Sequence, residues 1–185
     1  MNYYIADTHF GHANIIKFCN RPYKSVDEMD EELISNWNKK VKINDDIYIV
    51  GDFIYKQSGS PENYINKLNG RKHLIMGNHD HSWLNKADSS RWFADISPLK
   101  LIYDNDAKAH VVLCHYPLMT WIKEKQGSYM VYGHIHNHTF ELPFWPLIHD
   151  NDKMLNAGVD VNFFSPVTII ELIAHNKIFK EGASL

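Results

Sequence analysis

The chain has 185 residues, 44% of them apolar and 13% aromatic, and a formal net charge of −3. This length and apolar fraction support one domain with a hydrophobic core and argue against a disordered chain. The small negative charge, without a long basic run, argues against a protein that binds nucleic acid through charge alone. A nucleotide or a nucleic-acid end stays open as a substrate, so nucleic acid is left undecided as a partner.

The sequence predicts a cytoplasmic protein with one domain over residues 1–185. Strand-like residues begin at Asn2, which leaves no room for a signal peptide, and no apolar stretch approaches the length of a membrane span. We therefore expect no membrane partner. Cys19 and Cys114 fit no metal or redox spacing, which favours free thiols in a reducing compartment. The sequence does not define an oligomeric state.

The first half of the chain alternates apolar runs, polar loops and helical patterns. Ser25 and Glu28 have the spacing of a capping box, and Pro61 suits the first position of a helix. Three repeats of strand, loop and helix predict a parallel sheet covered by helices. The expected strands are 3–6, 47–50 and 71–76, and the expected helices are 15–18, 26–40 and 61–68.

After residue 90 the pattern becomes more antiparallel. A turn at 104–106 joins two strands into a hairpin, and Thr168 with Glu171 again fits a capping box, here for a last helix over 168–176. Segment 137–153 is expected to be an irregular surface loop. The expected strands of this half are 99–103, 109–114, 129–132 and 155–161.

The tetrapeptide Gly77-Asn78-His79-Asp80 is the most informative stretch of the sequence. It follows the apolar run 74–76, so it lies where a strand ends, and open α/β folds place their chemistry at that end. Asn78 offers an amide oxygen, His79 an imidazole, and Asp80 a carboxylate that could orient this imidazole. All three are also ordinary loop residues, so the tetrapeptide alone is only moderately specific.

Similar polar residues follow other predicted strands. Asp7 and His9 are two residues apart, as are His134 and His136, so each pair can face one point from an extended chain. Five separate segments carry such residues, and carboxylates mixed with imidazoles suit two divalent transition ions better than a thiolate zinc site. The full set is Asp7, His9, Asp52, Asn78, His79, Asp80, His115, His134 and His136.

Three further residues are weaker candidates for substrate contact. His12 and Asn14 lie close to the first polar pair, where a helix cap is an equally good interpretation. Arg21 could reach a phosphate group, although a solvated loop arginine is the simpler interpretation.

In their order along the chain, these motifs resemble the calcineurin-like metallophosphoesterase superfamily. The resemblance spans Asp7 to His136, and no ligand position is replaced. It implies an α/β fold, a four-layer α/β/β/α sandwich of two mixed β-sheets flanked by helices. The matching motifs are Asp7-Thr8-His9, Gly51-Asp52, Gly77-Asn78-His79-Asp80, His115 and Gly133-His134-Ile135-His136.

The resemblance also implies roles for these residues. Asp7, His9 and His136 would hold one ion, Asn78, His115 and His134 the second, and Asp52 would bridge both. His79 would donate a proton to the leaving group or stabilise the phosphoryl oxygens, and Asp80 would orient it. A hydroxide shared by the two ions would attack phosphorus in line. Manganese is the favoured ion, and iron, zinc or nickel suit the same ligands.

The expected function is a dinuclear-metal-dependent phosphoester hydrolase, most simply a phosphodiesterase for small or nucleotide-type substrates. The alternatives are a phosphomonoesterase, a nuclease acting on nucleic-acid ends, and a non-catalytic metal-binding scaffold. The chain leaves little room for a cap domain, so an open site with rims at 53–64, 116–128 and 137–153 is expected. Aromatic residues in these rims could stack on a base, although covering the core is the commoner role: Tyr116, Trp121, Phe144 and Trp145.

Overall fold

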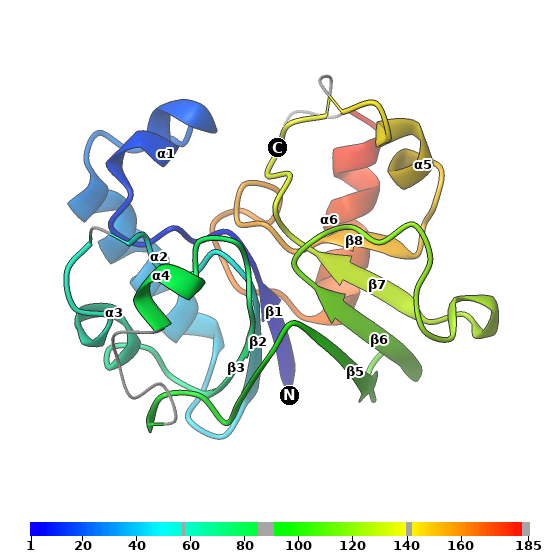
Figure 1. Ribbon diagram of the computed structural model, residues 1–185, viewed down its shortest axis with the longest axis horizontal. Helices are drawn as coiled ribbons and strands as arrows, with labels where there is room; N and C mark the ends of the chain where they lie inside the picture. Colours follow the sequence, from blue (N-terminus) through cyan, green and yellow to red (C-terminus); the bar gives the residue numbers. More distant parts are fainter. Residues whose placement is uncertain (57, 85–90, 140–141, 183–185) are drawn as a thin grey trace.

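The protein folds into two four-stranded β-sheets, one from each half of the chain (Figure 1). The computed structural model describes residues 1–56, 58–84, 91–139 and 142–182. The strands of each sheet follow one another in chain order, so residues 2–97 build the first sheet and residues 99–156 the second. The first sheet contains β1 (Asn2–Ile5), β2 (Asp46–Val50), β3 (Arg71–Ile75) and β4 (Asp95–Ser97). The second contains β5 (Leu99–Asp104), β6 (Ala109–Cys114), β7 (Tyr129–Tyr132) and β8 (Met154–Asn156).

The two sheets differ in strand direction. All neighbouring strands of the first sheet are parallel, and its edge strand β1 adds one antiparallel bridge between Tyr4 and Val167. In the second sheet, β5 and β6 form the predicted antiparallel hairpin, whereas β6, β7 and β8 are parallel. The predicted change of pattern in the second half is therefore confirmed.

Helices cover the first sheet on its outer face. These are α1 (Ala13–Phe18), α2 (Val26–Lys40), α3 (Glu62–Ile65) and α4 (His81–Leu84). The second half contributes the 3₁₀ helix Glu124–Gln126, α5 (Trp145–His149) and α6 (Ile169–Lys180). Ser25 caps α2 by accepting a hydrogen bond from the Glu28 amide, and Thr168 and Glu171 form the complete capping box of α6.

Three apolar clusters separate the layers. Met29, Leu33 and Trp37 of α2 pack on the outer face of the first sheet. Between the sheets, Tyr4 and Val50 meet residues of the second sheet, and Leu172 of α6 closes this cluster. The outer face of the second sheet is covered by Trp121, Ile135 and Ile148. This arrangement confirms the four-layer α/β sandwich, although its last layer consists mostly of loop.

Several predicted elements have different bounds in the structure. The strand expected at 155–161 ends at Asn156, because the Asn156 side chain accepts the Gly158 amide and the Asn162 side chain donates to two carbonyls of this stretch, which curls the chain. The helix expected at 61–68 is only four residues long, with Pro61 as its N-cap, and continues as tighter turns in which each amide bonds three residues back.

Four short elements of the described chain are absent from the prediction, and one of them is the 3₁₀ helix Glu124–Gln126. Helix α5 lies inside the expected loop 137–153, where Pro146 is tolerated in the first helical turn because amides there have no helical partner. Helix α4 and strand β4 are four and three residues long, too short for a periodic signal. No helix in the described part of the chain is long and apolar enough to cross a membrane.

Candidate metal centre

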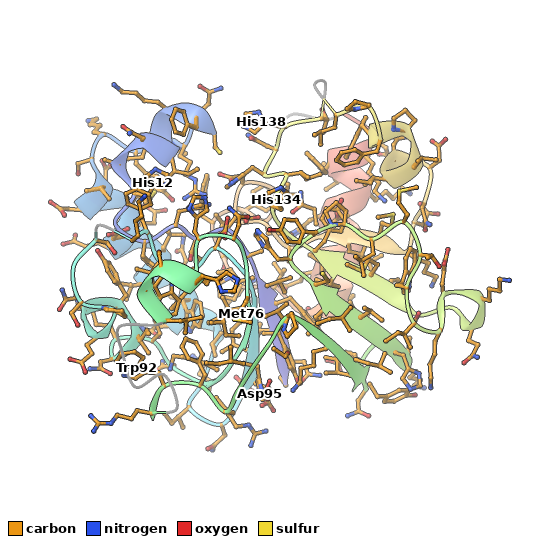
Figure 2. The ribbon with its side chains drawn as sticks, viewed as in Figure 1. His12, Met76, Trp92, Asp95, His134 and His138 are labelled. Carbon is orange, nitrogen blue, oxygen red and sulfur yellow. The ribbon has the colours of Figure 1, made fainter. Side chains whose placement is uncertain are left out.

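The polar strand ends predicted from the sequence meet at the junction of the two sheets. Four overlapping groups of potential ligands form there among the described residues, and within each group the ligand atoms lie within 4.8 Å of one another. Two of these groups consist only of predicted metal ligands. The first group is Asp7, His9 and His136, and the second is Asp52, His115 and His134. Figure 2 shows His134 at the seam between the halves and His12 in the half built on the first sheet.

The backbone is left-handed at five of the predicted ligand positions. This region is uncommon for residues other than glycine, and such strain concentrates at functional sites. Here it lets the chain leave each strand and turn a side chain back towards the junction. The φ angles are 57° at Asp7, 50° at His9, 53° at Asp52, 71° at His134 and 50° at His136.

Glycines allow these loops to approach one another closely. A Cβ atom on Gly77 would collide with the Asp52 carboxylate, and one on Gly51 would collide with the His115 ring. A Cβ atom on Gly133 would likewise lie too close to the Asp7 carboxylate, at 2.8 Å from its Oδ2. The motif glycines are therefore required by the packing of the ligand side chains.

Asp52 occupies the centre of the cluster. Its Oδ2 lies 3.4 Å from Nε2 of His115, 3.7 Å from Nε2 of His9 and 3.8 Å from Nε2 of His79. Burial alone would raise the pKa of Asp52, but the neighbouring imidazoles His115 and His9 bring it below its ordinary value. Asp52 is thus an anionic oxygen donor in contact with both ligand groups, as a bridging ligand would be.

His9 carries an orphaned nitrogen. Its side chain is 2% exposed, and Nε2 has no hydrogen-bond partner. Burial, together with the positive charge of His136, lowers the pKa of His9 well below its ordinary value, so the ring is neutral and its lone pair is free. A buried, unpaired nitrogen costs free energy unless a cation occupies its lone pair. The donor set therefore fits divalent metal ions.

The amide of Asn78 belongs to the second ligand group. Its Oδ1 lies 3.2 Å from Nε2 of His115 and 3.1 Å from Nδ1 of His134. The donor atoms of Asn78, His115 and His134 thus face one point, the grouping that the family resemblance implies. Asn78 and His134 are exposed, so this group is open to solvent.

Asp80 does not orient His79, contrary to the prediction. Its carboxylate accepts backbone N–H bonds from Gly77, Asp52 and Phe53 at 2.8, 2.9 and 3.0 Å, and the Trp83 indole N–H at 3.1 Å. All of its lone pairs are directed at these donors. Asp80 therefore joins the exits of β2 and β3, and it acts on His79 only through the backbone.

His79 is placed beside the ligands and remains accessible. Its side chain is 38% exposed, its backbone N–H donates to Oδ1 of Asp52 at 2.9 Å, and its ring packs edge-on against His9 with centroids 5.2 Å apart. This position suits a group that exchanges protons with a substrate held by the two ligand groups.

A buried ion pair supports the first ligand group and was missed in the sequence. Nδ1 of His136 donates to Oδ2 of Asp160 at 2.8 Å, and the same carboxylate accepts Nε of Arg21 at 2.8 Å. Arg21 also donates to the carbonyls of Asp7 and Thr8 at 2.7 and 3.0 Å. The strand predicted at 155–161 contains Asp160. Its position two residues after Gly158, where the chain leaves a strand, is a sequence signal that could identify it as a site residue.

The predicted substrate contact of Arg21 does not fit this arrangement. Its side chain is 0% exposed and its guanidinium bonds Asp160 and two carbonyls, so it positions ligands instead. Asn14 is exposed on the first turn of α1.

His12 is buried at the N-cap position of α1, but its side chain makes no capping bond. Its ring stacks on Tyr55 at 3.9 Å between centroids, and its Nδ1 lies 3.4 Å from Nδ1 of His9. Burial and the nearby His79 lower the pKa of His12 to about 4, which keeps it neutral.

The aromatic residues of the rims divide into two kinds. Tyr116 is 44% exposed and its ring lies 4.7 Å from that of His134, so it borders the second ligand group. Trp121 is buried and donates its indole N–H to Ser128, and Phe144 and Trp145 pack on the outer cluster of the second sheet. These three cover the core, which leaves Tyr116 as the rim aromatic placed beside the site.

Comparison with known proteins agrees with the geometry. Residues 3–182 match the family model of the calcineurin-like phosphoesterases. "Uncharacterized protein MJ1445" of Methanocaldococcus jannaschii is 35% identical in an alignment 184 positions long, which covers 96% of this chain and 94% of that protein. "Gene 66 protein" of Mycobacterium phage L5 is 26% identical over 94% of each chain.

A solved structure has a similar fold. The Aquifex aeolicus protein AQ665, described as a protein of unknown function, superposes with a TM-score of 0.69 and 27% identity over 90% of this chain and 94% of that one. The fold is that of an α/β protein whose strand ends carry a His/Asp cluster that could hold metal ions. The chain belongs to the calcineurin-like phosphoesterase family.

Proposed function

We propose that this protein is a dinuclear-metal-dependent phosphoester hydrolase that favours phosphodiesters of small or nucleotide-type molecules. One observation carries the proposal. Asp52 belongs to the second ligand group and lies 3.7 Å from His9 of the first, and the partly exposed His79 lies beside them. This is an arrangement for charge neutralisation next to a proton donor, as hydrolysis of an anionic ester requires.

The residues divide by role. Asp7, His9 and His136 would hold one ion, Asn78, His115 and His134 the other, with Asp52 between them. When bound, two divalent ions supply Lewis acidity that lowers the pKa of water and offsets the charge of the phosphoryl oxygens. Manganese is the favoured ion, with iron, zinc and nickel as alternatives.

His79 would act on the substrate directly. Its ring is accessible, and its Nε2 lies 3.8 Å from the Asp52 carboxylate. A protonated His79 can donate to the leaving oxygen as the ester bond to phosphorus breaks. The same proton can hydrogen-bond a phosphoryl oxygen before that step.

The open second ligand group supports a diester substrate. Asn78, His134 and Tyr116 are exposed next to one another, so a phosphate with groups on both sides can approach.

The buried thiols of Cys19 and Cys114 are free, which supports a cytoplasmic location.

The test compares bis-p-nitrophenyl phosphate with p-nitrophenyl phosphate, using protein stripped of metal and then supplied with Mn²⁺. We expect activity on the diester that returns with Mn²⁺. Activity on the monoester alone would replace the proposal with a phosphomonoesterase, and cleavage of single-stranded oligonucleotides alone would replace it with a nuclease. Bound metal with no turnover of any ester would favour a scaffold.

Two variants separate the roles of the site residues. His79→Ala should lower kcat by about 10²–10⁴-fold and leave the metal content unchanged, because His79 acts on protons. Asp52→Ala should lose metal as well as activity. Normal metal content and wild-type turnover in both variants would refute the site assignment.

A further inference from the structure

A cavity that is separate from the candidate metal centre lies in the half built on the second sheet. It has a volume of about 420 Å³ and opens between β7, the segment before β8, and the C-terminal half of α6. In Figure 1 these elements lie in the half of the molecule that carries α5 and α6. None of its lining residues belongs to the two ligand groups. The residues used below are Lys153, Lys177, Lys180, Tyr129, Leu155 and Ile173.

Two of the lysines in this cavity have no carboxylate partner. Lys180 donates from Nζ to the carbonyls of Asn151 and Met154 at 2.7 and 2.9 Å, and Nζ of Lys153 lies 3.9 Å from the centre of the Tyr129 ring. Neither ammonium takes part in an ion pair within the described ranges of the chain. Burial lowers the pKa of Lys180 to about 8. Asp152, which also lines the cavity, acts on Lys180 in the opposite direction without forming an ion pair with it in the described chain. Partly buried charges are normally paired, so both ammonium groups can take an anionic partner.

The remaining charges leave the cavity net positive at neutral pH. Asp152 and Glu181 line it too, and Glu181 lies 4.0 Å from Nζ of Lys177 with both side chains largely exposed. His149 lines the cavity and contacts Asp150 at 2.7 Å. Three lysines therefore face two carboxylates. The buried Leu155 and the partly buried Ile173 supply an apolar wall beside these charges.

We propose that this cavity binds a small organic anion, with its phosphate or carboxylate group at Lys153 and Lys180 and its apolar part against Leu155 and Ile173. The volume suits a molecule of ligand size, and the mixture of apolar wall and few cations is typical of small-molecule sites. The anion would supply the partner that Lys180 lacks.

The cavity is joined to the metal centre by buried asparagines. Asn176 lines the cavity, and its Oδ1 accepts the backbone N–H of Asn156 at 2.6 Å. The Asn156 side chain in turn donates to the carbonyl of His136 at 2.8 Å. A ligand in the cavity would therefore act on His136 through two hydrogen bonds. This link, unlike the binding itself, rests on the proposed metal centre.

The binding test uses 8-anilinonaphthalene-1-sulfonate, a fluorescent organic anion, with Mn²⁺-loaded protein. We expect saturable binding that weakens with salt, because surface charges are screened. The variant Lys153→Met/Lys177→Met should bind roughly tenfold more weakly, since it loses two favourable charges. The control Lys67→Met/Lys125→Met changes the net charge equally at exposed positions outside the cavity and should bind like wild type.

Competing locations for the dye are tested in the same way. An apolar groove lined by Met119, Phe144 and Leu147 could also take its rings. Weaker binding in Leu147→Glu, together with unchanged binding in the cavity variant, would overturn the proposal. Lys180→Met offers a second test, since it should also weaken binding if the unpaired ammonium holds the anion. Equal loss in the cavity and control variants would likewise overturn it.

The link to the metal centre has its own readout. Mn²⁺ affinity is measured by calorimetry with and without saturating dye, and a change of about fivefold or more is expected. A bound dye that leaves the Mn²⁺ affinity unchanged overturns the link and supports the binding site. The dye titration is repeated with metal-free protein. Its outcome does not depend on whether the protein binds Mn²⁺ or hydrolyses esters, so failure of the proposed function is distinguishable from failure of this proposal.

Discussion

Asp160 lies 2.8 Å from Nδ1 of His136, and its other face is occupied by Arg21. The pair is buried. It connects the candidate ligand His136, in the loop after β7, with the backbone at the β1 exit, where Arg21 donates to the carbonyl of Asp7. A carboxylate behind a ligating imidazole fixes the orientation of the ring and increases its basicity. The first ligand group is therefore held in place by residues outside it.

Replacing Asp160 tests this support. Asp160→Asn should weaken Mn²⁺ binding by about 10–100-fold, because His136 loses its anionic partner. It should also lower the free energy of unfolding, by up to about 3–5 kcal/mol, because Arg21 stays buried without its counter-ion. Calorimetric titration and urea denaturation measure the two effects. Asp150→Asn, the same change at the exposed Asp150–His149 pair, is the control and should alter neither quantity.

We expect Asp80 to contribute mainly to the stability of the fold, although it directly follows the proposed proton donor His79. Asp80→Asn keeps the shape but presents an amide N–H₂ group to donors that now face a carboxylate oxygen. Because each buried donor left unpaired costs about 1–3 kcal/mol, we expect a loss of several kcal/mol in urea denaturation. The exposed Asp106→Asn serves as control. Wild-type stability with reduced kcat would instead restore a direct role for Asp80 beside His79.

The raised pKa of Asp30 predicts that the stability of the fold depends on pH. Burial raises the pKa of Asp30 from 3.8 to about 6, although the Gly11 amide donates to its carboxylate and acts in the opposite direction. Between these two values the folded chain binds more protons than the unfolded chain. The stabilisation is therefore complete below pH 3.8 and is lost as the pH rises through 6, by about 3 kcal/mol in total.

Asp30→Asn should remove this loss, because an amide does not ionise. The free energy of unfolding of the variant, minus that of wild type, should increase between pH 5 and pH 8 in parallel urea titrations. A constant difference across this range would show that Asp30 titrates normally in the folded state.

The strain of the left-handed backbone at His134 can be measured by comparing the stability of glycine and alanine variants. In metal-free protein, His134→Gly should be more stable than His134→Ala by about 1 kcal/mol, since only glycine adopts a φ of 71° without cost. At His79, where the backbone is not left-handed, the order should be reversed because glycine gains more entropy on unfolding. Thermal unfolding of the four variants provides the comparison.

Local signals predicted the regular elements well. The capping-box spacings of Ser25 with Glu28 and of Thr168 with Glu171 predict helices α2 and α6, and Ser25 and Thr168 do cap them. The ligand positions followed from polar residues after apolar runs, and the family resemblance then grouped them. The structure brings these residues together as the resemblance implied, and metal binding itself stays a prediction.

The remaining features depend on contacts that no local pattern encodes. Arg21 and Asp160 are 139 residues apart and meet only in the folded chain. Asp80 follows His79 directly, which suggested a contact between them, yet the backbone turns its carboxylate towards the exit of β2. Strand β4 forms by pairing with β3 despite its three residues. All three features depend on contacts between segments that are distant in the sequence, so the neighbouring residues do not indicate them.

The sequential order of the two sheets has a consequence for biosynthesis. A chain that leaves the ribosome from its N-terminus completes the first sheet with residue 97, before any of the second is made. Both ligand groups need a partner from the second sheet, His136 in one and His115 with His134 in the other. The nascent first half therefore displays Asp7, His9 and Asp52 without a full coordination set. Under the proposed function, metal capture is therefore a late event that requires translation past residue 136.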